Sequence, residues 1–246
     1  SDAAGCRAAA QARTGDDKNP VSQSNLSTSR RINLDSRVAM TFLFSDSGLQ
    51  RLNEIIRPGA LCLFDFDGTL APIVMAHQDA QLPTDILEQL LQLSAFAPVG
   101  IITGRSITDI RARLRFTPHF LIGNHGLEGV PGWEGRTGDH EALSQAWAYT
   151  IFSELQQDAA FDPRISLENK RYSLSVHFRH ARDPARTEQQ LSALFERLAP
   201  RPRVMAGKCV FNVLPQGAAD KGSALEQLMR VTGAPSAIYV GDDITD

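Results

Sequence analysis

The chain is poor in cysteine, and no stretch of it is apolar for long. Its three cysteines, Cys6, Cys62 and Cys209, have the spacing of neither a metal site nor a disulfide framework, so we expect reduced thiols in a cytoplasmic protein. No apolar run approaches the roughly 20 residues that a membrane span needs, and no segment resembles a signal peptide. The net charge of −3 provides no basic surface for nucleic acid. We therefore expect neither a nucleic-acid partner nor a membrane partner.

The first 39 residues differ in composition from the rest of the chain. They are rich in Ala, Ser, Asn, Gln and Arg and contain few large apolar residues, which predicts a disordered leader over residues 1–39. Met40 directly precedes the apolar stretch Phe42-Leu43-Phe44, so our hypothesis is that translation starts at Met40. The chain as a whole, with 42% hydrophobic residues, is long enough for one large or two small domains.

Two carboxylates stand directly after a short apolar run. Leu61-Cys62-Leu63-Phe64 has the composition of a buried parallel strand, and open α/β sheets place their ligands at the carboxyl ends of such strands. Strand alternation points Asp65 and Asp67 to the same side, and Gly68 allows a sharp turn after them. Two like charges this close favour either a shared proton or a bound divalent cation. Taken alone, the pair could also belong to an ordinary turn.

Three later segments place further polar groups at the end of a strand or the start of a helix. They are Thr103-Gly104-Arg105 after the apolar run Val99-Gly100-Ile101-Ile102, Lys221-Gly222 at the start of a helical pattern, and Gly241-Asp242-Asp243 after Ala237-Ile238-Tyr239-Val240. Each has a structural alternative, such as a helix cap, a solvated lysine or a turn. Together, two carboxylates, a hydroxyl, a lysine and a late acidic pair are the groups that metal-assisted phosphoryl transfer requires.

In this order the four segments resemble the motifs of the haloacid dehalogenase superfamily. The resemblance implies an α/β fold with a Rossmann-like parallel sheet. It also implies that Asp65 is a nucleophile that forms an aspartyl-phosphate. Asp67 would protonate the leaving sugar oxygen and later take a proton from the attacking water. Thr103 would donate a hydrogen bond to the phosphoryl oxygens, and Lys221 would place a positive charge against them.

The same resemblance implies a metal cofactor, Mg²⁺. Its ligands would be the carboxylates of Asp65 and Asp242 and the backbone carbonyl of Asp67. Such a set suits an ion that takes oxygen ligands and keeps several waters. Asp243 and Asp246 would orient Lys221 or metal-bound water.

The middle of the chain narrows the resemblance to one family. Four stretches resemble trehalose-6-phosphate phosphatases: Gly123-Asn124-His125-Gly126-Leu127-Glu128, Glu168-Asn169-Lys170, His177-Phe178-Arg179 and Gly207-Lys208. The likeness runs from about Leu61 to Asp246 and implies hydrolysis of trehalose 6-phosphate to trehalose and phosphate, with pathway coupling to a trehalose-6-phosphate synthase. The implied substrate contacts are Arg105, His125, Glu128, Lys170, Arg179, Lys208 and Asn212.

Two features depart from the family pattern. Asn212 stands where the family has a glutamate, and an amide can hydrogen-bond to sugar hydroxyls but carries no charge. This keeps open a related enzyme for sucrose-phosphate or mannosyl-phosphoglycerate. A non-catalytic sugar-phosphate-binding module is the alternative from another class. The family pattern also continues past Asp246, so we expect a core that is truncated at its C-terminus.

The spacing of the motifs predicts the domain organisation. The chain between Asp67 and Thr103 has room for one helix that Thr84 caps, with Ile86, Leu87, Leu90 and Leu91 on its apolar face. We expect a core formed by residues 40–127 and 207–246, and an inserted α+β cap formed by residues 128–206. The cap would contain a helix over about 142–157, a second helix from Asp183, and a strand whose polar face carries Ser175 and His177. In the strand that follows the cap, alternation predicts that Lys208 and Asn212 share one face.

Overall fold

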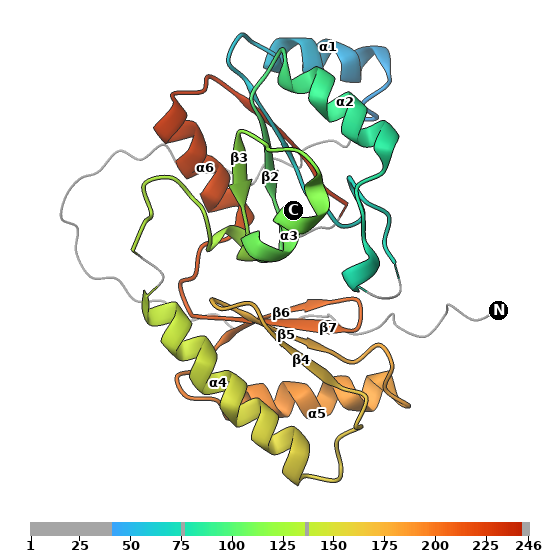
Figure 1. The fold of residues 1–246 in the computed structure, drawn as a ribbon, viewed down its shortest axis with the longest axis vertical. Coiled ribbons are helices and arrows are strands. Elements are labelled where there is room, and N and C mark those ends of the chain that lie inside the picture. The colour runs from blue at the N-terminus through green and yellow to red at the C-terminus, as the bar shows by residue number, and fades with distance from the viewer. Residues whose placement is uncertain (1–40, 75–76, 136–137, 243–246) are drawn as a thin grey trace, which may run out of the picture.

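The computed structural model describes residues 41–74, 77–135 and 138–242. Figure 1 shows two β-sheets, one above the other, with helices on both sides of the upper sheet and below the lower sheet. The expected disordered leader, the proposed start at Met40 and the two late acids Asp243 and Asp246 lie outside the described residues. No helix in the described part of the chain combines the length and the apolar character needed to cross a membrane.

The first sheet is parallel and has the strand order β3-β2-β1-β8. Its strands are β1 (Leu61–Phe64), β2 (Val99–Ile102), β3 (Phe120–Ile122) and β8 (Ala237–Val240). Every residue of β2 is buried, as expected for a strand that is covered on both faces. The α/β fold with a parallel sheet, predicted from the sequence, is confirmed.

Helices cover both faces of this sheet (Figure 1). They are α2 (Thr84–Ser94), α3 (Ile107–Leu114) and α6 (Lys221–Thr232). The same part of the chain contains α1 (Asp46–Ile55) and the short 3₁₀ turns η1 (His77–Asp79) and η2 (Asn124–Gly126). α2 and α3 pack with Ile101 on one face, whereas α6 packs with Leu63 and Ile102 on the other. The parallel sheet therefore lies between two layers of helices.

The start and the buried face of α2 differ from the sequence-based expectation. Thr84 is the first residue of the helix, and Pro83 takes the cap position without a side-chain cap bond. Leu91 is 51% exposed, whereas Leu90 is buried. The stripe that packs against the core contains Ile86, Leu87, Leu90 and Leu93, and Leu91 falls outside it.

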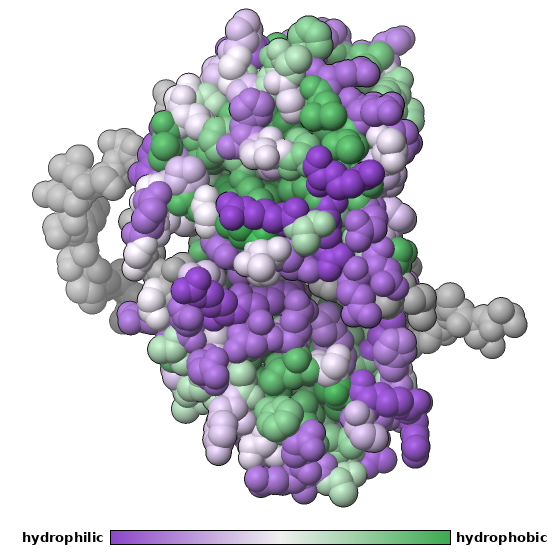
Figure 2. Space-filling view, in the orientation of Figure 1, coloured by the Kyte–Doolittle hydropathy of each residue, from purple (hydrophilic) through white to green (hydrophobic). Residues whose placement is uncertain are grey.

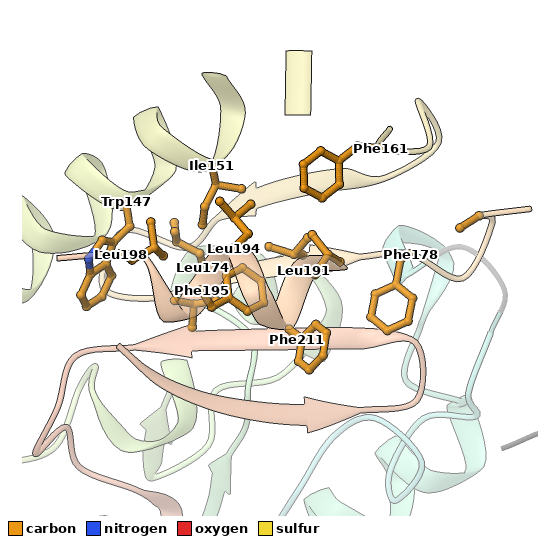
Figure 3. Close-up of a cluster of buried hydrophobic side chains, with 13 residues drawn as sticks. Trp147, Ile151, Phe161, Leu174, Phe178, Leu191, Leu194, Phe195, Leu198 and Phe211 are labelled. Atoms are coloured by element: carbon orange, nitrogen blue, oxygen red, sulfur yellow. The ribbon is translucent and has the colours of Figure 1, made fainter. Parts of the chain in front are cut away.

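The second sheet is antiparallel, with the order β4-β5-β7-β6. It contains β4 (Ser166–Asn169), β5 (Leu174–His177), β6 (Arg203–Gly207) and β7 (Val210–Leu214), and its helices are α4 (Gly138–Gln157) and α5 (Pro184–Glu196). Figure 3 shows the apolar core that joins them, with Trp147 from α4, Leu191 and Phe195 from α5, and Phe211 from β7. α5 starts where the sequence predicted, and Asp183 caps it, its side chain accepting from the Arg186 N–H.

β6 and β7 form a hairpin with Lys208-Cys209 as its two-residue turn. Cys209, the second residue of the turn, has a φ of 60°, whereas Lys208 does not have a positive φ. This is the pattern of a type II turn, not of the I′ and II′ turns that are most common in two-residue hairpins. The boundary expected at residue 206 falls inside this hairpin, and Asn212 lies in the second sheet. Lys208 is part of the turn, so it does not share a strand face with Asn212.

An ion-pair ladder fixes the first turns of α3. Ser106 caps the helix by accepting from the Asp109 N–H. The Asp109 carboxylate contacts Arg105 at 2.6 Å and Arg113 at 2.5 Å. Burial raises the pKa of Asp109, but its hydrogen bonds with Arg113 and Arg105, together with their charges, outweigh this and lower it from 3.8 to about 2.

We predict that Asp109→Asn lowers the free energy of unfolding at pH 7 by up to about 2 kcal/mol, the equivalent of this pKa shift. Because the pKa is lower in the folded state, this stabilisation is complete above about pH 4 and is lost as the pH falls toward 2. Urea unfolding at pH 7, 5, 4 and 3 should therefore show that the difference in the free energy of unfolding between the wild type and Asp109→Asn becomes smaller as the pH falls. Glu88→Gln, an exposed change on α2, should have little effect at any pH. A deficit of equal size at every pH would refute the electrostatic explanation.

Candidate functional site

Three strands of the parallel sheet deliver the predicted polar residues to one edge. The Asp65 N–H donates to the Val240 carbonyl at 2.9 Å, and the Thr103 N–H donates to the Ile122 carbonyl at 2.9 Å. The backbone hydrogen bonds between neighbouring strands therefore continue just past the ends of β1, β2, β3 and β8. Asp65, Thr103 and Asp242 come from separate segments, yet the shared edge places them around the same point.

Asp65 forms a nearly buried ion pair with Lys221. The Lys221 Nζ lies 3.0 Å from the Asp65 Oδ1, and their side chains are only 8% and 9% exposed. Lys221 is the first residue of α6, where the capping box of Asp220 and Ser223 fixes the start of the helix. The ring of Tyr239, at 6.0 Å, also faces the ammonium group. A carboxylate oriented by one cation in a nearly dry site can act as a nucleophile.

Asp67 has a different partner, the guanidinium of Arg105. The Arg105 Nε donates to the Asp67 Oδ2 at 2.7 Å, and a terminal nitrogen donates to the Oδ1 at 2.6 Å. The Arg105 side chain is only 1% exposed, whereas that of Asp67 is 38% exposed. Burial lowers the pKa of Arg105, but hydrogen bonds and charges from Asp67 and Asp109 outweigh it and raise this pKa above its ordinary value. The two carboxylates thus differ in both partner and access to solvent.

Thr103 and His125 adjoin the same turn. Thr103 is fully buried, and its hydroxyl accepts from the Arg105 N–H at 3.2 Å, which leaves the hydroxyl proton to be donated elsewhere. The His125 ring packs directly on Gly104, where an added Cβ would lie 2.5 Å from the ring Cε1. Glycine at 104 therefore allows the ring to reach the edge of the sheet.

The acidic residues at this edge fit a small, oxygen-ligated cation. Asp242 lies against the turn after Asp67, since a Cβ added to Gly68 would be 2.1 Å from the Asp242 Oδ2. Gly68 also has a φ of 86°, so the turn and the close approach both require glycine. Within the described residues, no three His, Cys, Asp or Glu side chains form a metal cluster. Two carboxylates and a backbone carbonyl suffice for Mg²⁺, which keeps several waters.

A cleft of about 810 Å³ separates this edge from the second sheet. Figure 2 shows hydrophilic residues in a band across the middle of the molecule, between more hydrophobic halves. From the parallel sheet and its helices, the predicted residues that line the cleft are Asp65, Asp67, Arg105, His125, Lys221 and Asp242. From the second sheet and its loops they are Lys170, Arg179, Lys208 and Asn212.

The face of the second sheet that lines the cleft is polar. The strand register places Glu168, Ser175 and Asn212 in one row across β4, β5 and β7. The Ser175 Oγ donates to the Asn212 Oδ1 at 2.6 Å, and the His177 Nε2 lies 3.0 Å from the Glu168 Oε2. This row confirms the predicted polar face and offers hydroxyl, amide, imidazole and carboxylate groups to a hydroxyl-rich ligand.

The motif around Asn124 joins the two sheets. Asn124 is fully buried with a φ of 51°, a conformation that asparagine tolerates better than most residues. Its Nδ2 donates to the Lys170 carbonyl at 3.0 Å, and its Oδ1 accepts from the Ser173 hydroxyl at 2.8 Å. The Lys170 Nζ in turn donates to the Gly104 carbonyl at 3.1 Å, and burial lowers the pKa of this ammonium group.

Two predicted site residues do not line the cleft. Thr103 is buried beneath it, and the Glu128 Oε2 instead accepts from the Ile107 N–H and the Asn124 Nδ2 at 2.9 and 2.8 Å. Glu128 therefore satisfies a donor at the start of α3. No role was predicted for Asn124 or for the Glu168–His177 pair. The signal for Asn124 was its place in the stretch Gly123-Asn124-His125-Gly126, and the signal for the pair was strand alternation.

Comparison with known proteins agrees with this geometry. The family model described as trehalose-phosphatase matches residues 63–246. The trehalose-phosphate phosphatase of Mycobacterium tuberculosis is 34% identical over 197 residues, which is 74% of this chain and 48% of that protein. Trehalose-phosphate phosphatase B of Arabidopsis thaliana is 28% identical over 221 residues, or 81% of this chain and 59% of that protein.

A solved structure supports the fold. A trehalose-6-phosphate phosphatase related protein superposes with a TM-score of 0.59 at 22% identity, covering 76% of this chain and 79% of that one. The chain spans about half the length of the mycobacterial relative that it matches. Because the family model covers most of the chain, from β1 through β8, the chain belongs to the trehalose-phosphatase family.

Proposed function

We propose that the protein hydrolyses trehalose 6-phosphate to trehalose and inorganic phosphate. Family membership supports the reaction class, and the mycobacterial relative is named for this activity. The observation that carries the proposal is the pair of carboxylates at one sheet edge. Asp65 is held by Lys221 and Asp67 by Arg105, and both line a cleft opposite a polar sheet face.

In the first half-reaction, an Asp65 oxygen attacks phosphorus, and the bond between phosphorus and the sugar oxygen breaks. Lys221 offsets negative charge on the transferring phosphoryl group, and the Thr103 hydroxyl donates to it. Asp67 gives its proton to the leaving sugar oxygen. The products of this half are free trehalose and an aspartyl-phosphate on Asp65.

In the second half-reaction, water attacks the aspartyl-phosphate. Asp67, now ionised, takes a proton from that water. The bond between phosphorus and the Asp65 oxygen breaks, inorganic phosphate leaves, and the Asp65 carboxylate is regenerated. Asp67 ends the cycle protonated, as it began.

Asp65, Asp242 and the Asp67 carbonyl would hold Mg²⁺ in this proposal. The ion would neutralise charge on the phosphoryl oxygens and help to orient the substrate. The support is the chemistry of the donors and the close packing of Asp242 on Gly68. The sugar would contact the second sheet, which we propose acts as a cap. A trehalose-6-phosphate synthase would supply the substrate.

Because of Asn212, a related sugar phosphate is a second candidate for the substrate. Its amide stands where the family pattern has a glutamate, and it is oriented by Ser175 within the polar row. A sucrose-phosphate or mannosyl-phosphoglycerate would meet the same row of hydroxyl and amide groups. The chemistry on Asp65 would be unchanged, so only the identity of the sugar separates the two candidates.

We predict that Asp65→Asn lowers the rate of phosphate release by about 10³-fold or more, because an amide is a very poor nucleophile. The measurement is steady-state phosphate release, with circular dichroism to establish that the variant is folded. Asp85→Asn, an exposed change of the same chemistry on α2, should keep the wild-type rate. A folded Asp65→Asn protein with more than a trace of activity would show that the nucleophile lies elsewhere.

We predict that chelation by EDTA abolishes phosphate release and that excess Mg²⁺ restores it. The reason is that Asp65 and Asp242 add negative charge to a site that must accept an anionic phosphate. The measurement is activity of the same sample before EDTA, after EDTA and after Mg²⁺ addition. Undiminished turnover after complete chelation would rule out the metal.

We predict that Lys208→Ala raises KM for trehalose 6-phosphate about 10-fold, the value of one hydrogen bond to a charged group. KM for p-nitrophenyl phosphate should change little, because that compound does not reach the β6–β7 turn. Arg201→Ala, an exposed cation outside the cleft, is the matched control. Equal increases for both substrates would mean that Lys208 supports the fold or the chemistry rather than sugar recognition.

A further inference from the structure

Arg105 was expected to bind substrate, but its guanidinium contacts protein carboxylates. Its Nε and one terminal nitrogen donate to Asp67, and the other terminal nitrogen donates to Asp109 at 2.6 Å. The guanidinium also lies over the Phe66 ring, 5.6 Å from its centre. To bind a phosphate instead, the Arg105 guanidinium, whose side chain is only 1% exposed, would have to leave both of these ion pairs.

We propose that Arg105 is a positioning residue that holds the Asp67 carboxylate in place for its proton transfers, and that it does not bind the substrate. This inference rests on the proposed function. The two-point contact fixes both the position and the plane of the carboxylate, which a single contact cannot do. Each carboxylate oxygen has two lone pairs, so the contact leaves acceptor capacity on both.

Arg105 is itself held in place by Asp109, which belongs to the ion-pair ladder on α3. Asp109 contacts Arg105 and Arg113, and Arg113 donates to the backbone carbonyls of Gln78 and Ala80 at 2.6 and 3.1 Å. Gln78 belongs to the segment after β1 that lines the cleft. The ladder therefore connects the position of Asp67 to both the helix and the wall of the cleft.

The contrast with Lys221 supports a positioning role. Asp65 must move its oxygen onto phosphorus and is paired with a lysine, a compact charge on a flexible stem. Asp67 must present an oxygen at a constant distance from two successive partners, the sugar oxygen and the water. A rigid, forked guanidinium suits that requirement, and a lysine could not replace it.

Arg105→Lys tests the proposal because it keeps the positive charge and removes the two-point contact. With trehalose 6-phosphate in the full-length protein, we expect kcat to fall about 10- to 100-fold, since a misplacement of roughly 1 Å costs about that much. KM should stay within about twofold. Arg111→Lys, an exposed change on the same helix, should match the wild type.

The leaving group provides a second readout that a merely structural role would not change. p-Nitrophenol leaves without help from an acid, so Arg105→Lys should still form the aspartyl-phosphate quickly with p-nitrophenyl phosphate. Hydrolysis of that intermediate still needs Asp67 as a base. Rapid mixing should therefore show a burst of about one equivalent of p-nitrophenol, followed by slow turnover.

Four outcomes decide the matter. A raised KM with an unchanged kcat would show that Arg105 binds substrate and would overturn the proposal, as would kinetics equal to those of Arg111→Lys. If Arg105→Lys does not fold, Asp109→Asn, which loosens Arg105 from behind, must lower kcat without raising KM, or the proposal fails. Loss of phosphate release in the wild type and Arg111→Lys alike would instead refute the proposed function.

Discussion

The repulsion among three carboxylates at one edge of the parallel sheet is the constraint on which the site depends. Asp65, Asp67 and Asp242 meet there because β1 and β8 are hydrogen-bonded neighbours. Lys221 offsets the charge of Asp65, and Arg105 offsets that of Asp67 whenever Asp67 is ionised, as it is after the first half-reaction of the proposed cycle. A phosphate monoester would add further negative charge. The proposed Mg²⁺ would neutralise the negative charge that the two side-chain cations leave. The start of α6 and the ladder on α3 are both built to hold these cations in place.

The sequence was sufficient to predict this edge but not the direction of every side chain on it. Parallel strands end on one side of a sheet, so apolar runs followed by Asp65, Thr103 and Asp242 had to converge. Nothing in the spacing of Gly104-Arg105 indicated that the guanidinium would face Asp67. The contact made by Glu128 could not be predicted either, because its partner is a backbone N–H at the start of α3 that only the folded chain brings near.

In the second sheet too, the sequence pattern predicted which side chains share a face but not the individual contacts. Strand alternation correctly separated the apolar residues Leu174 and Val176 of β5 from Ser175 and His177. The hairpin at Lys208-Cys209 was not foreseen, because no Gly or Asn marks the turn. The buried contacts of Asn124 with Ser173 and Lys170 also depend on a left-handed backbone conformation that the sequence merely permits. Through them, the sheet proposed to recognise the sugar is attached to the sheet that carries the chemistry.

The most direct measurement of the central claim is inorganic phosphate release by the full-length protein from a panel of sugar phosphates with Mg²⁺. The panel should include trehalose 6-phosphate, sucrose 6-phosphate, mannosyl-3-phosphoglycerate and glucose 6-phosphate, compared by kcat/KM. The account predicts the highest kcat/KM for trehalose 6-phosphate. A clear preference for another sugar would contradict the assigned substrate, and binding of trehalose 6-phosphate without any phosphate release would contradict the assignment as an enzyme.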